Sequence, residues 1–382
     1  VAEGVLEVRD QGGLGTSDLV QIEGSGALYL EFGTVLPSSV DLRVGVLSSS
    51  HNVLRSNGGN NTFNGDIIVD NVDNLGNLIY TPYINVGTGD TLNLNGTIYG
   101  ALASNPLSQD TTLNDARIIS TNSSSAGIIN INGTFQDNIL GAGTGIIGAT
   151  ENELLRFQIG GNDQLIVNVR NQWNAAGNIL LERGYLRYEG DGNFWTDDAA
   201  SAIVPTNSQS GMRLSGSISS NAGNINLVLT KDGQKLNIDR IDIGGNGSSD
   251  NYNDLGNITL AGTNTSGTVT FGNGVERIVY GSSDAARAHN RDLSVYAAGG
   301  GTVNLDFRLD DTDTDVHTSF TKIGRGVVNY NSAGTLAAPI ATNGDVEQLN
   351  LSGGLLRLTN YGGATGTRFD NGAMVVFAGG GI

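Results

Sequence analysis

Apolar and polar residues alternate along most of this chain in short runs. The alternation is clear at 91–98 (TLNLNGTI), 128–135 (IININGTF), 223–230 (GNINLVLT) and 302–309 (TVNLDFRL). A period of two is typical of strands with one buried face. Gly, Asn, Asp and Ser separate the runs at intervals of roughly 8 to 12 residues, which indicates turns. Helical periodicity is confined to short stretches at 152–157 and 284–289, so the pattern predicts an all-β fold.

A short phrase recurs along the chain: Gly, any residue, a large apolar residue, any residue, and a second large apolar residue. Copies begin at Gly4, Gly26, Gly184, Gly326, Gly354 and Gly372. We expect the glycine to form a corner and both apolar residues to point into the core from one strand. Copies spaced by roughly 20 residues match one coil of a parallel β-solenoid. A propeller needs longer and more regular blades, and a sandwich would not repeat one strand so often.

A second phrase occurs twice, as LTKDGQKLNI (229–238) and FTKIGRGVVNY (320–330). The later copy, together with LNLSGGLLRL (349–358), resembles the autotransporter-associated β-strand repeat. NTFNGDIIVD (61–70) and INVGTGDTLNLNGTI (84–98) resemble its middle portions, and LEVRDQGGLGTSD (6–18) resembles its linker. The resemblance implies a right-handed parallel β-helix that serves as the passenger stalk of a large secreted or surface-attached bacterial protein, often an adhesin. Each Thr-Lys phrase would then begin one repeat unit.

We therefore predict a single elongated right-handed parallel β-helix over residues 1–382, with about 15 to 19 coils of roughly 20 to 25 residues. Segments near 99–127, 190–212 and 281–295 depart from the repeat, and we expect inserted loops there. The chain begins and ends within the Gly-initiated phrase. We expect it to be a section of a longer chain, whose terminal coils continue into further coils or pair with another copy.

Stacking of coils makes two predictions about side chains. In the Gly354 phrase, Leu356 and Leu358 should be buried, while Leu355 and Arg357 should face outward, because side chains alternate along a strand. Asn residues at the corners of successive coils can form ladders of side-chain amides. The sequence therefore predicts interior columns of apolar residues.

Composition and charge restrict the partners and the location. Hydrophobic residues make up 38% of the chain, enough for a core, and the net charge is −18. That charge argues against nucleic acid and anionic membranes, which need clustered Lys and Arg. No apolar run approaches the length of about 18 residues that spans a bilayer, so we expect no membrane insertion. The absence of Cys excludes thiolate catalysis and Cys-based metal sites. The acidic surface is typical of an extracellular protein, and the resemblance to the autotransporter-associated repeat implies the bacterial cell surface.

Three classes of function fit this fold. We expect a structural or adhesive section that contacts a host surface, a glycan or an extracellular matrix. The first alternative is a self-assembling filament or sheath subunit. The second is a glycan-processing enzyme similar to pectate lyases, which needs paired carboxylates or a carboxylate-bound cation in one cleft. His51, His289 and His317 are scattered, and no catalytic motif is present, so we predict that this section is not an enzyme and has no organic cofactor.

One acidic cluster has the spacing of a cation site. Asp311, Asp313 and Asp315 alternate in LDDTDTDVH (309–317), so that three carboxylates on one side of the chain could hold Ca²⁺. Val316 and Lys322 stand where an EF-hand needs Gly and Glu, which excludes that motif. The alternative is a solvated corner loop whose charges oppose aggregation.

One aromatic segment could contact a glycan or a protein partner. RGYLRYEGDGNFW (183–195) places Tyr185 and Arg187 outward, if Leu186 and Tyr188 point inward. Exposed aromatic side chains on a rigid sheet can stack on sugar rings or anchor a partner. We expect Tyr185, Arg187, Phe194 and Trp195 to form this contact. The alternative is an inserted loop that packs Phe194 and Trp195 over the flank of the solenoid.

Overall fold

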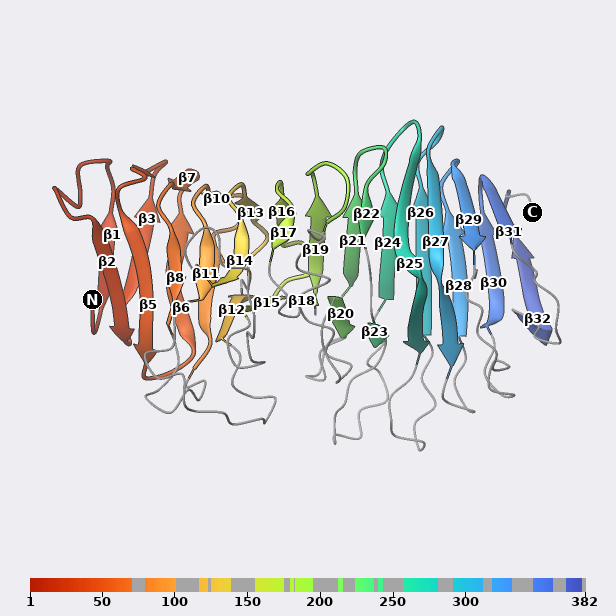
Figure 1. The fold of residues 1–382 in the computed structure, drawn as a ribbon, viewed down its shortest axis with the longest axis horizontal. Helices are drawn as coiled ribbons and strands as arrows, with labels where there is room; N and C mark the ends of the chain where they lie inside the picture. Colours follow the sequence, from red (N-terminus) through yellow and green to blue (C-terminus); the bar gives the residue numbers. More distant parts are fainter. Residues whose placement is uncertain are drawn as a thin grey trace. The chain divides into compact units, whose positions relative to one another are not determined.

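The computed structural model of the chain is built from β-strands (Figure 1). It describes residues 1–70, 80–100, 117–122, 125–138, 155–174, 179–181, 183–194, 212–215, 224–236, 240–242, 257–280, 291–311, 318–331, 346–359 and 369–379. These residues contain no helix, so the prediction of an all-β fold is confirmed for them. In particular, they include no helix long and apolar enough to cross a membrane.

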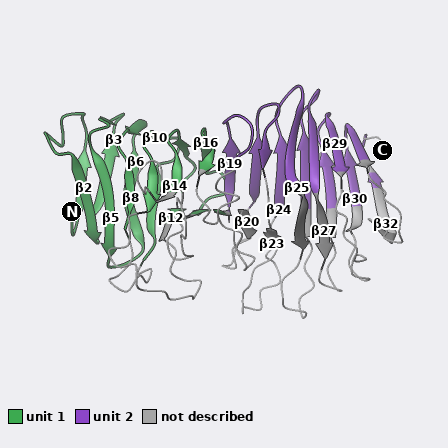
Figure 2. Ribbon diagram, viewed as in Figure 1, with its two compact units in different colours: residues 1–180, 195–210 green, residues 181–194, 211–382 purple. Residues whose placement is uncertain are grey.

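The chain divides into two compact units (Figure 2). Among the described residues, the first unit comprises those up to Leu180 and the second those from Leu181 onward. The division falls within β18 (Ile179–Leu181). Each unit is built from sheets whose neighbouring strands are parallel.

Three sheets form the first unit, and the chain visits them in turn. The first sheet has the order β1 (Val5–Val8), β3 (Ala27–Glu31), β6 (His51–Asn57), β9 (Pro82–Val86), β12 (Arg117–Asn122) and β15 (Leu155–Gly160). The second has the order β4 (Val35–Leu36), β7 (Asn60–Phe63), β10 (Thr91–Leu94), β13 (Ile128–Ile131) and β16 (Ile166–Val169). The third has the order β2 (Leu19–Gly24), β5 (Asp41–Leu47), β8 (Ile67–Val69), β11 (Ile98–Gly100), β14 (Phe135–Asn138) and β17 (Trp173–Asn174). From β2 to β14, each strand of this unit therefore pairs with the third strand after it, whereas β1 pairs with β3.

Two longer sheets and a short pair of strands form the second unit. One sheet has the order β19 (Gly184–Tyr188), β21 (Ile225–Leu229), β24 (Asn257–Gly262), β26 (Arg291–Ala297), β28 (Thr318–Ile323), β30 (Val346–Ser352) and β32 (Phe369–Phe377). The other has the order β22 (Lys235–Leu236), β25 (Thr268–Tyr280), β27 (Thr302–Asp311), β29 (Val327–Asn331) and β31 (Leu355–Thr359). The short pair is β20 (Met212–Ser215) and β23 (Arg240–Asp242).

We call neighbouring strands of one sheet successive rungs. Pairing of each strand with one from the next turn of the chain is consistent with a β-solenoid. The turns are often longer than the predicted 20 to 25 residues. Asn304 and Asn329 on successive rungs are 25 residues apart, whereas Asn130 and Asn168 are 38 apart. Longer turns favour fewer coils than the predicted 15 to 19.

Two pairs of Gly-initiated phrases lie on successive rungs, as predicted. In the first unit Leu6 pairs with Leu28 and Val8 with Leu30. In the second unit Val328 pairs with Leu356, and both side chains are buried. Leu356 is 1% exposed, Leu355 is partly exposed and Arg357 is exposed, which confirms the predicted alternation at these positions. The side chain of Leu358 lies outside the described residues.

The Gly372 phrase does not follow the prediction. Val376 is 37% exposed and pairs with the partly exposed Asn350, whereas Val375 pairs with the buried Leu349. The pairing of β30 with β32 shifts register between Val346 and Gln348. The offset between paired residues changes by three at this point, and an odd shift exchanges the two faces of a strand, so the prediction that Val376 points inward is wrong.

The two Thr-Lys phrases occupy the same corner of the second unit but are offset along the strands. One leads from β21 to β22 and the other from β28 to β29, with Gly233 and Gly324 in the left-handed region. Through successive pairings, however, Lys322 is aligned with Leu227, four positions before Lys231. Lys231 is accordingly exposed, whereas Lys322 is fully buried.

Lys322 is the charged member of an otherwise apolar stack. This interior column contains, on successive rungs, Leu186, Leu227, Leu260, Val295, Lys322 and Leu351. The Lys322 ammonium donates hydrogen bonds to the carbonyl oxygens of Ile323, 3.1 Å away, and Gly324, 2.5 Å away. Burial lowers the pKa of Lys322 to about 8, because an apolar environment disfavours its charged form.

Asn-Gly pairs form a ladder at one corner of the first unit. Asn95 donates to the side-chain oxygen of Asn64 at 2.6 Å, and Asn132 donates to that of Asn95 at 2.7 Å. A Cβ on Gly96 would overlap the carbonyl oxygen of Gly65, and one on Gly133 would overlap that of Gly96. Successive corners approach so closely that only glycine fits, and the Asn side-chain amides join one corner to the next by hydrogen bonds.

A second amide ladder runs along the outer face of the first unit. Asn130 donates to the side-chain oxygen of Asn93 at 2.8 Å, and Asn168 donates to that of Asn130 at 2.8 Å. Asn93 donates in turn to the Thr62 hydroxyl at 3.2 Å. The ladder at the Asn-Gly corner confirms the predicted amide ladder, whereas this second ladder lies within the strands and was not predicted.

The predicted loop insertions fall mostly outside the described residues. Residues 190–194 form a loop after β19, but the other two segments contain strands where the structure describes them. Within 99–127, β12 pairs in parallel with β15, and within 281–295, β26 pairs with β24 and β28. Insertions in the remaining parts stay a prediction.

Candidate partner-binding surface

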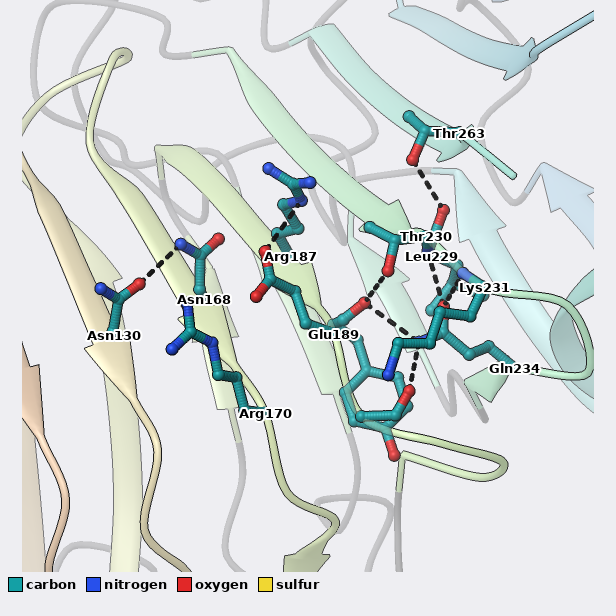
Figure 3. A network of polar contacts seen from close by, with 12 residues as sticks. Asn130, Asn168, Arg170, Arg187, Glu189, Leu229, Thr230, Lys231, Gln234 and Thr263 are labelled. Atoms are coloured by element: carbon teal, nitrogen blue, oxygen red, sulfur yellow. Dashed lines mark hydrogen bonds and ion pairs between the residues drawn. The ribbon is translucent and has the colours of Figure 1, made fainter. Parts of the chain in front are cut away.

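The outer face of β19 carries two of the residues singled out in the sequence. Side chains alternate along this strand, with Leu186 and Tyr188 buried and Tyr185 and Arg187 exposed. Tyr185 is 36% exposed. The Arg187 guanidinium lies 3.4 Å from a Glu189 carboxylate oxygen, and 46% of its side chain is exposed (Figure 3). An exposed pair of this kind adds little stability and leaves the cation accessible.

Tyr188 anchors the loop that follows β19. Its hydroxyl lies 3.0 Å from the carbonyl oxygens of both Asp191 and Asn193 and can donate to either. Its ring packs edge to face with Phe194, with centroids 5.1 Å apart. Burial, and to a lesser extent the nearby Asp191 carboxylate, raises the pKa of Tyr188 to about 12. The phenol therefore stays protonated and acts as a structural hydrogen-bond donor.

Gln234 holds this loop to the next rung. Its amide nitrogen donates to the carbonyl oxygens of Tyr188, 3.1 Å away, and Gly190, 2.6 Å away. Its amide oxygen accepts from the backbone N–H groups of Thr230 and Lys231 (Figure 3). All the bonding capacity of this buried amide is used. The exposed Lys231 ammonium adds an ion pair 2.9 Å from Asp191.

The aromatic segment thus separates into two parts. Phe194 is fully buried, which matches a structural role and leaves no ring surface for a partner. Trp195 lies outside the described residues. Tyr185 and Arg187 are exposed on one strand, and their contact with a partner stays a prediction.

A row of uncharged polar side chains continues from Tyr185 across the outer face of the second unit. Each member pairs with the next in parallel register, and all are partly exposed. This polar row consists of Asn226, Thr259, Ser294, Thr321 and Asn350. Asn350 donates to the Thr321 hydroxyl at 3.2 Å. Within the described part of the chain, the side chains of Asn226, Thr259 and Ser294 have no hydrogen bond.

An apolar strip runs beside the polar row, two residues further along each strand. It consists of Val228, Ala261, Tyr296 and Ile323, which pair in succession. Val228 and Ala261 are nearly buried, Tyr296 is partly exposed and Ile323 is 36% exposed. A Cβ on Gly324 would lie 2.9 Å from the Tyr296 ring, so this ring rests against the glycine.

The structure does not test the predicted Ca²⁺ site, because two of its three Asp residues lie outside the described ranges. Asp311 lies at the end of β27, where its backbone pairs with Tyr280. Asp313 and Asp315 lie outside the described residues, as do His289 and His317. No group of three or more His, Asp or Glu side chains that could hold a metal ion occurs in the described ranges. The ring nitrogens of His51 lie 2.7 and 2.9 Å from the carbonyl oxygens of Ser49 and Gly26.

Two features of the site were missed from the sequence. Gln234 belongs to the first Thr-Lys phrase, but nothing in that phrase distinguishes a buried amide from an exposed one. The polar row joins residues from different turns of the chain, so their alignment depends on the pairing of strands. Alternation within each run shows only that they face away from the core.

Comparisons of this chain with models of protein families, with curated proteins and with solved structures find no match.

Proposed function

We propose that this chain is a structural and adhesive section of an extracellular bacterial surface protein, built as a right-handed β-solenoid. Its interior columns and outer rows repeat from rung to rung, as a stiff stalk requires. The resemblance of residues 320–330 and 349–358 to a passenger repeat supports the same role. The net charge of −18 is compatible with a hydrated position outside the cell.

One observation carries the adhesive part of the proposal. The outer face of the second unit presents Tyr185, the polar row and the apolar strip side by side on consecutive strands. Hydrogen-bonding groups next to apolar surface are the usual composition of a recognition surface. The parallel strands hold these groups in fixed positions, so a partner does not have to order them.

Attachment of protein-coated beads tests this function. Beads coated with the whole chain should bind to cultured cells, to matrix protein or to polysaccharide-coated glass above the level of albumin-coated beads. Light scattering and negative-stain images of the same preparation should show separate particles. Attachment no greater than that of albumin on every surface would overturn the adhesive role. Fibres that form with rising concentration would favour the filament subunit instead.

A further inference from the structure

The outer faces of the two units differ in whether their polar side chains are hydrogen-bonded to one another. In the first unit, Asn93, Asn130 and Asn168 bond to one another along the ladder. In the second unit, Asn226, Thr259 and Ser294 lie on successive rungs, and the structure, where it describes them, gives their side chains no hydrogen bond. The amide ladder of the first unit stabilises the fold. The polar row of the second unit leaves the donors and acceptors of Asn226, Thr259 and Ser294 available to a ligand.

The polar row forms a straight array, in which Asn226, Thr259 and Ser294 have no side-chain hydrogen bond and Asn350 donates to the Thr321 hydroxyl. Asn226, Thr259, Ser294, Thr321 and Asn350 occupy five consecutive strands, and neighbouring strands are about 4.8 Å apart. The row is therefore roughly 19 Å long, enough for several sugar rings of an extended chain. A ligand that repeats along its length can make the same contact at each rung.

The apolar strip supplies the complementary contact. Tyr296 and Ile323 expose apolar surface directly beside Ser294 and Thr321 on the same two strands. A sugar ring has a face of C–H groups and a rim of hydroxyls, so it needs apolar and hydrogen-bonding surface together. The Tyr296 ring rests against Gly324 and is held in place for such a contact.

The absence of charge on this surface restricts the ligand. Every residue of the polar row and the apolar strip is uncharged, on a chain whose net charge is −18. An acidic polymer would be repelled by the chain, and Arg187, which pairs with Val228 at the end of the apolar strip, is already ion-paired with Glu189. A protein partner would more often use a large aromatic or Arg anchor in a pocket.

We propose that the polar row and the apolar strip together bind an extended, uncharged polysaccharide. This inference rests on the proposed adhesive function and names its ligand class. Sugar hydroxyls exchange hydrogen bonds with Asn226, Thr259 and Ser294, while ring faces lie over Tyr296. Many weak contacts along the array add up, so affinity rises with the length of the oligosaccharide.

Titration calorimetry on the whole chain tests the ligand class. The probes are cellohexaose, chitohexaose and maltohexaose, with the hexamer of galacturonic acid as the charged comparison. At least one uncharged hexamer should bind, more tightly than its trimer, and the acidic hexamer should not. Binding of the acidic hexamer alone, or of none of the four, would overturn the inference.

A matched pair of variants tests the location. Thr259→Glu places a charge in the polar row, and Thr91→Glu makes the same change on the outer face of β10 in the first unit. Thr259→Glu and Tyr296→Ala should each weaken binding of the uncharged hexamer at least tenfold, while Thr91→Glu leaves it unchanged. Circular dichroism shows whether each variant is folded. If folded Thr259→Glu and Tyr296→Ala proteins both bind normally, or Thr91→Glu weakens binding equally, the site is not here.

The bead assay separates this inference from the function on which it rests. Beads that attach to cells or matrix protein, with no hexamer bound, would refute the polysaccharide and keep adhesion. If the beads do not attach and no hexamer binds, both the adhesive function and the polysaccharide ligand are refuted.

Discussion

At the residue scale, Lys322 is the clearest departure from an apolar interior. Its ammonium is bonded only to the carbonyl oxygens of Ile323 and Gly324 among the contacts that the structure gives. Nothing in the Thr-Lys phrase predicts burial, because Lys231 in the other copy is exposed. The two lysines differ in burial because Lys322 is aligned with Leu227, four residues before Lys231, in the pairing of strands.

The lowered pKa of Lys322 predicts a dependence of stability on pH. Its folded-state pKa of about 8 lies below the ordinary value of 10.5, so the unfolded chain binds more protons between these values. Stability should therefore rise with pH from about 8 to 10.5, and the cost of burying the charge is fully present below pH 8. Between pH 7 and pH 10, the unfolding free energy of the parent should gain on the order of 2 kcal/mol relative to Lys322→Met. Urea titrations of both proteins measure this difference, and parallel pH profiles would contradict it.

The lack of space for a side chain at Gly96 gives a second prediction at the residue scale. A methyl group there would overlap the Gly65 carbonyl oxygen of the preceding corner. Gly96→Ala should destabilise the fold by about 1 to 3 kcal/mol or more, because the backbone must move. Gly12, whose Cβ would have only ordinary contact with Asp10, provides the control. Gly12→Ala should change stability by less than about 0.5 kcal/mol. Equal unfolding midpoints for the two variants would refute the close stacking of the corners.

At the scale of elements, alternation within single runs could be predicted from the sequence, but the pairing between runs could not. Leu28, Leu30 and Leu356 are buried as the Gly-initiated phrase predicted. The same phrase failed at Val376, where a register shift reverses the faces of β32. Such a shift depends on the partner strand, which lies a whole turn away in the chain. For the same reason, the sequence indicated Tyr185 and Arg187 but could not align the polar row beside them.

The amide ladder predicts a difference between two Asn substitutions on outer faces. Asn130 donates to Asn93 and accepts from Asn168, so Asn130→Ala removes both bonds and leaves a nearly buried amide without its acceptor. Stability should fall by about 1 to 3 kcal/mol. Asn226 has no side-chain hydrogen bond in the structure as described, and Asn226→Ala should change stability by less than about 0.5 kcal/mol. Chemical unfolding compares the two, and an equal loss would show that the outer rows of the two units do not differ.

At the scale of the whole molecule, stacking of parallel rungs joins the fold to the proposed function. Each unit repeats interior and outer positions from strand to strand, and this repetition supplies a surface for an extended partner. The residues of the polar row and the apolar strip are uncharged, on a chain whose net charge is −18. If the proposed function is right, stability, stiffness and recognition all depend on the same register between successive turns.

Engineered disulfides test that register most directly, because the chain contains no Cys. Thr97 and Thr134 in the first unit have hydroxyls 3.2 Å apart, and Thr268 pairs with Thr302 in the second unit. Successive strands lie about 4.8 Å apart, within the range that a disulfide bridges. Positions two rungs apart, such as Thr62 and Asn130, are separated by roughly 10 Å and exceed it.

Mass spectrometry after mild oxidation of the three double-Cys variants gives the measurement. Parallel stacking predicts an intramolecular disulfide in Thr97→Cys/Thr134→Cys and in Thr268→Cys/Thr302→Cys, and none in Thr62→Cys/Asn130→Cys. If the first two variants stay reduced while folded, or if the third forms the bond as readily, the turns of this chain are not stacked in the register described.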